Sequence, residues 1–201
     1  MIPLALTSTI ATVEDYFWLE DQSEIRHEYR DGQVIPMTGG TPNHNELAGA
    51  LFVALRLALR GKPYRVFIAD QRLSIPKREI YIYPDIVVLL HPIRLQEGRK
   101  DTVINPILIA EILSPSTQSY DRGDKFEAYR SVATFQEYLL INQDYSHVEH
   151  YARQKSSQWL LTDHIDPPGE LTLASLQINI NLQELYENVA FPHSDGGSPA
   201  R

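Results

Sequence analysis

The sequence predicts a single mixed α/β domain in which a β-sheet is flanked by helices. An apolar run over residues 107–113, a helical pattern over 122–132 and a second apolar run over 137–141 predict a strand, helix, strand unit with parallel pairing. Alternating apolar and polar residues between 147 and 164 predict an additional antiparallel hairpin. Together these observations predict a mixed sheet.

The composition is that of an ordinary globular protein. The chain has 201 residues, of which 43% are hydrophobic and 22% charged, and its formal net charge is −8. This acidic balance argues against a surface built to coat nucleic acid. The absence of cysteine excludes disulfides, thiolate zinc sites and a cysteine nucleophile, which leaves oxygen and imidazole ligands for any metal. Neither a signal peptide nor a membrane span is expected, so we expect a cytoplasmic protein.

Turn and cap residues set the bounds of the elements in the first half of the chain. Thr12 can cap the first helix, and the Asp31-Gly32 pair is the strongest hairpin signal. Apolar residues from Leu47 onward recur at a helical spacing that Gly61 ends. The predicted elements are a helix over 13–19, a hairpin over 26–37, a helix that opens at Thr41 or Asn43, and strands over 64–68, 71–75 and 80–90.

The second half follows a charged surface loop over residues 94–101. The domain is expected to span residues 13–190, after an N-terminal arm over 1–12 and before a disordered tail, rich in Gly, Ser and Pro, over 191–201. The predicted elements are a strand over 107–113, a helix over 122–132, strands over 137–141, 147–153 and 158–164, short antiparallel strands within 171–180, and a helix from Asn181 to Glu187.

Two carboxylates interrupt the apolar strands. Glu111 stands inside the run 107–113, where an ionised side chain is costly unless it is paired or bound to a cation. The alternative is that Glu111 points into solvent or pairs with an arginine. Asp85 follows Pro84 and is by itself more typical of a turn. If the two strands are neighbours in one sheet, both carboxylates converge on one hard cation such as Mg²⁺ or Mn²⁺.

Lys125 completes this group of residues if the predicted helix folds back over the strand ends. A lysine there can orient an attacking water molecule or stabilise charge on a phosphate. Its spacing by itself favours an exposed lysine paired with Asp121, four residues earlier. Ser114, Ser116 and Thr117 are interpreted as loop and cap residues, because no histidine lies at a spacing that indicates a nucleophile.

Four motifs in this order resemble a known family. They are Tyr-Pro-Asp-Ile-Val-Val at 83–88, Ala-Glu-Ile-Leu-Ser-Pro-Ser-Thr at 110–117, Asp-Arg-Gly-Asp-Lys-Phe-Glu-Ala-Tyr at 121–129 and Glu-Tyr-Leu-Leu-Ile-Asn at 137–142. With the upstream His-Glu-Tyr-Arg-Asp-Gly-Gln-Val segment and the Asn43-His44 helix entry, the chain resembles the Uma family of bacterial restriction-endonuclease-like proteins over about residues 13–187.

This resemblance implies a restriction endonuclease-like core of the PD-(D/E)xK nuclease type. Asp85 would be the aspartate of the Pro-Asp motif and Glu111 the acidic residue of the second motif. The orthodox pattern has lysine two residues after Glu111, where this chain has Leu113. The resemblance implies that Lys125, on the following helix, takes that role.

The resemblance also draws attention to Glu28. Some nucleases of this fold have an additional helix or hairpin carboxylate, which would support a second metal or a water molecule, but an exposed hairpin position between two arginines is equally consistent with the sequence. His44 is interpreted as a capping or packing residue, and so are Asp70 and Gln71.

The resemblance implies an endonuclease that depends on Mg²⁺ or Mn²⁺ and hydrolyses phosphodiester bonds of DNA. Asp85 and Glu111 would hold the metal, and Lys125 and Glu28 would assist. A homodimer is expected by analogy with nucleases of this fold that pair to cut both strands. The alternative is an inactive module that binds nucleic acid or a protein partner through the same cleft. A third reading, a metal-free carboxylate pair of the glycosidase kind, is disfavoured by the resemblance. The basic residues that could form one face are Arg56, Arg60, Lys62, Arg65, Arg72, Lys77 and Arg78.

Overall fold

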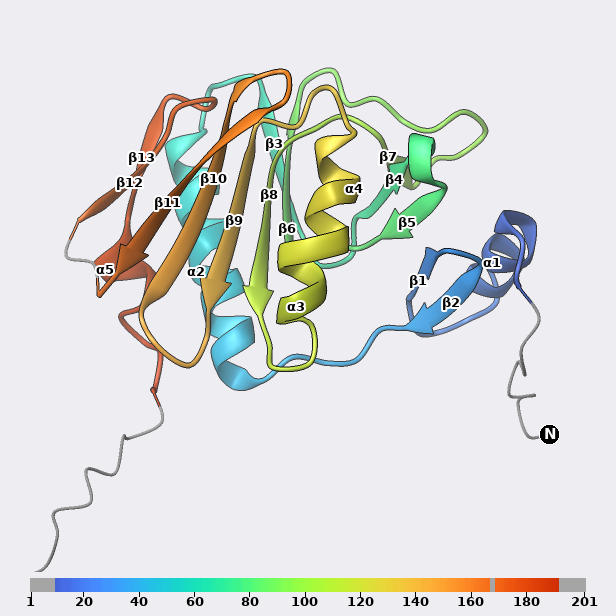
Figure 1. Ribbon diagram of the computed structural model, residues 1–201, viewed down its shortest axis with the longest axis horizontal. Helices are drawn as coiled ribbons and strands as arrows, with labels where there is room; N and C mark the ends of the chain where they lie inside the picture. Colours follow the sequence, from blue (N-terminus) through green and yellow to red (C-terminus); the bar gives the residue numbers. More distant parts are fainter. Residues whose placement is uncertain (1–9, 167–168, 192–201) are drawn as a thin grey trace, which may run out of the picture.

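A six-stranded mixed sheet forms the centre of the protein in the computed structural model, which describes residues 10–166 and 169–191 (Figure 1). Strands β8 and β9 pair in parallel, and the other neighbours in this sheet pair antiparallel. The mixed sheet that the sequence predicts is therefore confirmed. The strands follow the order β11 (Gln158–Ile165), β10 (His147–Lys155), β9 (Glu137–Asn142), β8 (Pro106–Leu113), β6 (Ile86–Leu90) and β3 (Tyr64–Ile68).

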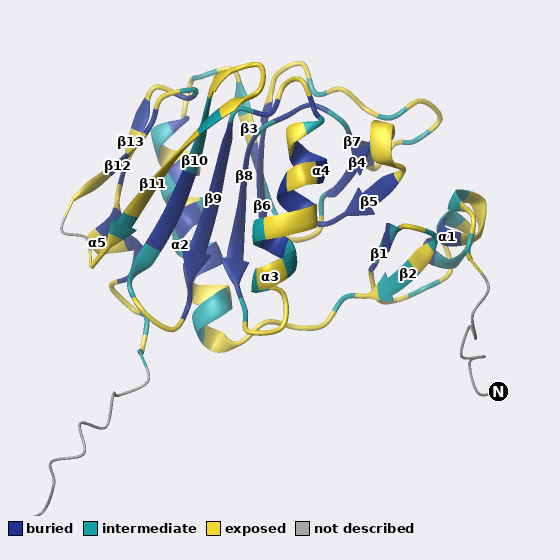
Figure 2. Cartoon of the chain, viewed as in Figure 1, coloured by how far each residue is buried: buried dark blue, intermediate teal, exposed yellow. Residues whose placement is uncertain are grey.

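Helices cover both faces of the central sheet because side chains alternate between its faces. Leu108, Ala110 and Ile112 of β8 pack in the core under α2 (Pro42–Ala58), together with the hairpin β12 (Glu170–Leu173) and β13 (Ile178–Asn181) and α5 (Leu182–Leu185). Ile109 and Leu113 point to the opposite core, under α4 (Phe126–Arg130). Figure 2 shows β8 and β9 as buried along most of their length. Glu111 falls on the α4 side by the same alternation.

A smaller five-stranded sheet lies beside the central one (Figure 1). Its outer face is covered by α1 (Val13–Glu20), where Tyr16, Tyr29 and Tyr81 form a separate aromatic core. The strands follow the order β2 (Gln33–Pro36), β1 (His27–Arg30), β5 (Ile80–Ile82), β4 (Arg72–Ile75) and β7 (Thr102–Val103), with the short 3₁₀ helix η1 (Pro76–Arg78) between β4 and β5.

The prediction of one strand over residues 80–90 is wrong. The structure has two strands there, β5 in the small sheet and β6 in the central sheet, and the chain crosses between the sheets over Tyr83 to Asp85. Pro84 explains the break, because proline has no N–H to continue a ladder of hydrogen bonds. Asp85 therefore lies at the junction of the two sheets.

The helical segment between β8 and β9 begins earlier than the predicted residue 122. It consists of α3 (Gln118–Tyr120), a π-helical turn η2 (Asp121–Lys125) and α4. Gly123 has φ −103° and ψ −105°, which are not helical values. The parallel pairing of β8 with β9 confirms the predicted crossover unit.

Several local predictions are confirmed. Thr12 caps α1 through a capping box, and the side chain of Thr41 caps α2. Asp31 and Gly32 both have positive φ, 50° and 72°, as a tight turn between β1 and β2 requires. The expected arm over 1–12 and tail over 191–201 lie almost wholly outside the described residues. No helix in the described ranges is long and apolar enough to cross a membrane.

Candidate active site

The fold brings Asp85 and Glu111 together. Asp85 directly precedes β6, Glu111 lies in β8, and these strands are antiparallel neighbours with Ile86 opposite Ala110. The backbone N–H of Asp85 donates to Oε2 of Glu111 over 3.3 Å, and Oδ2 of Asp85 accepts from the N–H of Ile112 over 2.7 Å. The two carboxylates thus occupy adjacent strand positions at one end of the central sheet.

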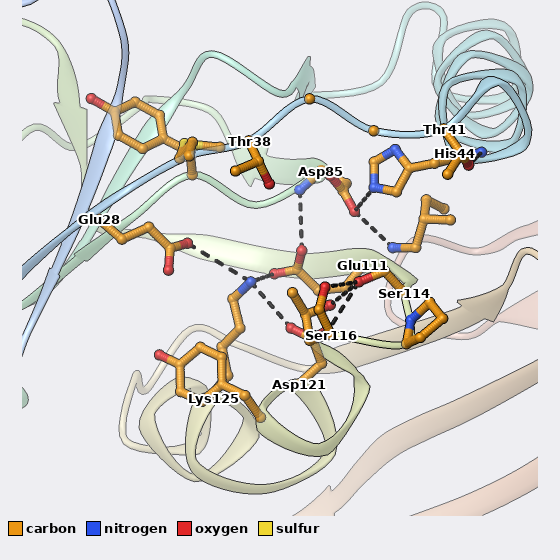
Figure 3. Close-up of a pocket in the computed structure, with 18 of the residues that line it drawn as sticks. Glu28, Thr38, Thr41, His44, Asp85, Glu111, Ser114, Ser116, Asp121 and Lys125 are labelled. Carbon is orange, nitrogen blue, oxygen red and sulfur yellow. Dashed lines mark hydrogen bonds and ion pairs between the residues drawn. The ribbon is translucent and has the colours of Figure 1, made fainter.

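Lys125 points from η2 into the same place (Figure 3). Its Nζ lies 2.9 Å from Oε1 of Glu111, 3.3 Å from Oδ1 of Asp121 and 3.9 Å from Oε1 of Glu28. The lysine side chain is only 8% exposed. The sequence spacing favours an exposed lysine, which the structure contradicts, although the pairing with Asp121 is present.

A kink in the helical segment accounts for the direction of this lysine. The kink lies at Gly123, whose φ and ψ are not helical. Asp121 and Lys125 are the buried residues of η2, and Gly123 lies between them. Both side chains thereby face Glu111 rather than solvent, and Tyr129 of α4 donates its hydroxyl hydrogen to Oε1 of Glu111 over 2.6 Å.

Glu28 belongs to the site and is not an exposed hairpin residue. Its side chain is 15% exposed and approaches Lys125 from β1 of the small sheet. Arg26, which the sequence places beside it, pairs instead with Asp70 at 2.8 Å. Asp70 and Gln71 lie in the connection between β3 and β4, and neither lines the cavity at the site.

Three residues of the site were not identified as functional from the sequence: His44, Asp121 and Tyr129. His44 was expected to cap or pack, but its Nε2 lies 3.2 Å from Oδ2 of Asp85, and its hydrogen bond to Asp85 raises its pKa. The cap itself is Thr41, whose Oγ1 accepts from the N–H of His44. The sequence signal for His44 is a polar ring in the first turn of α2. That signal does not identify its partner Asp85, which lies 41 residues later in the chain.

A cavity of about 560 Å³ opens onto these side chains. Five carboxylates line it, from Glu28, Asp85, Glu111, Asp121 and Asp144, whereas Lys125 supplies a single buried ammonium. Burial, together with the neighbouring carboxylates, raises the pKa of Glu111 to about 8 despite the ion pair with Lys125. Burial disfavours the charge of Lys125, but the carboxylates around it raise its pKa well above the usual value. The site is therefore short of positive charge.

The donor set fits a hard divalent cation. Within the described residues no group of three or more His, Asp or Glu side chains is arranged to hold a metal ion. Mg²⁺ does not need such a cage, because it is commonly held by one or two carboxylates together with water and substrate phosphate. Oδ1 of Asp85 accepts no hydrogen bond from the part of the chain that the structure describes, so this oxygen is open to a ligand.

Two residues of the predicted basic face, Arg72 and Arg78, are already paired with carboxylates. Arg72 is 4% exposed, and its guanidinium contacts Glu20 at 2.7 Å and the hydroxyl of Tyr83 at 2.7 Å. Arg78 pairs with Glu127 at the surface. These arginines serve the packing of the small sheet and the helical segment.

A mixed central sheet with two carboxylates at adjacent strand ends, and a lysine on the helix that follows, defines a protein of restriction endonuclease-like fold. The family profile that matches residues 13–183 is Uma2, "Putative restriction endonuclease". The chain belongs to this family, as the sequence motifs predict.

Similar proteins cover nearly the whole chain. Two proteins of Synechocystis sp. (strain ATCC 27184 / PCC 6803 / Kazusa) are similar. One, sll1609, is 37% identical over 86% of this chain and 97% of its own length. The other, slr1290, is 31% identical over 89% of this chain and 92% of its own length. A crystal structure described as "a putative nuclease belonging to DUF820", from Anabaena variabilis ATCC 29413, superposes with a TM-score of 0.66. It is 19% identical and covers 82% of this chain and 92% of its own, so it supports the fold.

Proposed function

We propose that this chain is a metal-dependent nuclease that hydrolyses phosphodiester bonds of DNA. The observation that carries the proposal is the ammonium of Lys125 held 2.9 Å from Glu111, which itself lies beside Asp85 at the strand ends. Core packing gives no reason to bury Glu111, Asp121 and Lys125 at one place beside a half-buried Asp85. Membership of the Uma2 family supports the same reaction class.

Asp85 and Glu111 are the residues that would hold Mg²⁺ or Mn²⁺. Asp85 offers the open Oδ1, while its Oδ2 is fixed by the Ile112 N–H and by His44. Glu111 is fixed through both oxygens, by Tyr129 and Lys125 at Oε1 and by the Asp85 N–H at Oε2. When bound, the ion would offset charge on the phosphate and make a water molecule a better nucleophile.

Lys125 has the contacts expected of a group that stabilises charge in the transition state. Three carboxylates keep it protonated, and they hold its ammonium at the floor of the cavity. An ammonium there can donate a hydrogen bond to a phosphate oxygen or orient the attacking water. Asp121 acts through Lys125 as a positioning residue, and Glu28 approaches from the other sheet, where it can accept a proton from water.

The test is cleavage of duplex and single-stranded DNA across a titration of Mg²⁺ and Mn²⁺. We expect the wild type to cut, and Asp85→Asn and Glu111→Gln to lose at least a hundredfold in rate, because removing a charge-stabilising group at an active site costs about that much. Glu46→Gln, which neutralises an exposed carboxylate on α2 outside the cavity, is the matched control and should cut normally.

Two results would contradict the proposal. Full cleavage by Asp85→Asn would exclude the assigned chemistry. Binding of Mn²⁺ that depends on Asp85 and Glu111, without cleavage of any DNA, would instead favour the inactive binding module.

A further inference from the structure

Arg30 lines the cavity together with His44 and Lys125, and it differs from both in having no carboxylate partner in the part of the chain that the structure describes. It lies on β1 two residues after Glu28, so both side chains leave the same face of the strand. Within residues 10–166 and 169–191, Arg30 forms no ion pair with a carboxylate. Its guanidinium instead lies 3.6 Å from the centre of the Tyr120 ring.

A second cavity, of about 590 Å³, begins at the same two residues. Arg30 and Tyr120 line both cavities, so the two spaces meet at this pair. The second cavity has carboxylates from Asp31, Asp124 and Glu127 along its wall. The other arginine of the second cavity, Arg78, is already paired with Glu127 at 2.5 Å. A phosphate is disfavoured among these carboxylates, whereas the hydrogen-bonding groups of a sugar or base are not.

Stacking on Tyr120 prepares Arg30 for an oxyanion. A guanidinium that rests its flat face on an aromatic ring is held in one orientation, and its N–H groups remain free along the edge. Arginine held in this way binds phosphate through two parallel hydrogen bonds. The pocket otherwise contains an excess of carboxylates, so a second phosphate of a nucleic acid has Arg30 as its nearest unpaired cation among the described lining residues.

We propose that Arg30, stacked on Tyr120, binds the phosphate next to the scissile phosphodiester of a DNA strand, and that the second cavity takes the sugar and base attached to it. This subsite rests on the proposed nuclease function, which it deepens by assigning the path of the strand from one cavity into the other. Arg30 is a substrate-binding residue in this assignment, and the chemistry stays with the residues around Glu111.

Equilibrium binding of a fluorescein-labelled single-stranded oligonucleotide tests the subsite. Fluorescence anisotropy is measured in Ca²⁺ instead of Mg²⁺ at several salt concentrations, and the length of the oligonucleotide is checked on a gel after each titration. We expect Arg30→Gln to weaken binding about tenfold. The negative slope of log K against log salt should become shallower by about 0.7, which is the contribution of one phosphate contact on a single strand.

Two variants separate charge from geometry. Arg94→Gln removes one positive charge from an exposed loop position outside both cavities and outside the predicted basic face, and it should leave the affinity and the salt slope unchanged. Arg30→Lys keeps the charge but loses the planar fork, so it should retain the salt slope and still bind more weakly than the wild type. Thermal melting of each variant checks that the fold is kept.

The outcomes separate this subsite from the proposed function. If Arg30→Gln binds with the same affinity and salt slope as the wild type, the subsite proposal is overturned even if the protein cuts DNA. It is also overturned if the wild type does not bind DNA. Binding that depends on Arg30 in a protein that cuts no DNA would support the subsite while the nuclease proposal fails. If the wild type cuts, Arg30→Gln should raise KM about tenfold with little change in kcat.

Discussion

Replacing Lys125 with methionine tests the central ion-pair network. Methionine keeps the length and the apolar stem of lysine but removes the ammonium that faces Glu111, Asp121 and Glu28. At 2.9 Å and an effective dielectric constant of about 20, the attraction to the ionised form of Glu111 is roughly 6 kcal/mol before desolvation is subtracted. Breaking a buried pair at one end costs about 3–5 kcal/mol net, because a buried charge is left without a partner.

The lower end of that range is expected here. Burial raises the pKa of Glu111 to about 8 even beside the ammonium, so at neutral pH this carboxyl is largely protonated already, and removing Lys125 leaves less buried charge without a partner. For a chain of about this size, 1 kcal/mol shifts the Tm by roughly 2–4 °C, so a loss of about 3 kcal/mol lowers the Tm by roughly 6–12 °C. Activity should be lost as well, because the cation of the site is gone.

Differential scanning fluorimetry with and without Mg²⁺ measures both effects. Mg²⁺ should raise the Tm of Lys125→Met by more than that of the wild type, because the ion supplies the positive charge that the variant lacks. Lys77→Met, at an exposed position in η1, is the matched control and should melt as the wild type does. If Lys125→Met melts within 2 °C of that control, the reasoning from the buried carboxylates is refuted.

Two further predictions concern hydrogen bonds to buried carboxylates. Tyr129→Phe removes the 2.6 Å hydrogen bond to Glu111 and should lower the free energy of unfolding by about 1.5–3 kcal/mol in urea titrations above pH 8, where Glu111 is ionised, with a smaller effect in a Glu111→Gln background where the partner is neutral; equal effects in both backgrounds would contradict this. Burial disfavours the ionised form of Glu20, but hydrogen bonds from Tyr83, His27 and Arg72 stabilise that form and lower its pKa below the ordinary value of 4.5. Its stabilisation is therefore present above pH 4.5 and lost as the pH falls through the lower folded pKa, so the wild type should lose more stability between pH 6 and pH 3 than Glu20→Gln. Parallel losses in the two proteins would show that Glu20 has no such role.

Glu111 could be predicted from the sequence because it conflicts with its local pattern, whereas Asp85 became a candidate only as its possible neighbour in the sheet. A glutamate inside an apolar strand is costly unless a partner stabilises its charge. Because Leu108, Ala110 and Ile112 of β8 point to one face of the sheet, Glu111 points to the other. The parallel crossover followed from strand and helix periods alone. These inferences depend on residues close in the sequence.

The remaining parts of the site depend on contacts between distant segments. Helical spacing cannot indicate that the helical segment kinks at Gly123, and that kink decides whether Lys125 is buried or exposed. His44 meets Asp85 only because the first turn of α2 packs near the end of β6. The break between β5 and β6 could be predicted from Pro84. The second sheet, in which β5 pairs, could not be predicted, because its strands come from distant parts of the chain.

The junction at Asp85 makes the site a composite of two sheets. Glu28 and Arg30 come from the small sheet, whereas Glu111 comes from the central one. Proteins open in cooperative segments of unequal stability, and we expect the edge formed by α1, β1 and β2, which packs on the separate aromatic core, to be such a segment. A local opening of that edge would withdraw Glu28 and Arg30 from the cavity while the central sheet stays folded. Loss of function on heating would then precede global unfolding, and the aromatic contacts of Tyr16, Tyr29 and Tyr81 would set the temperature at which it begins.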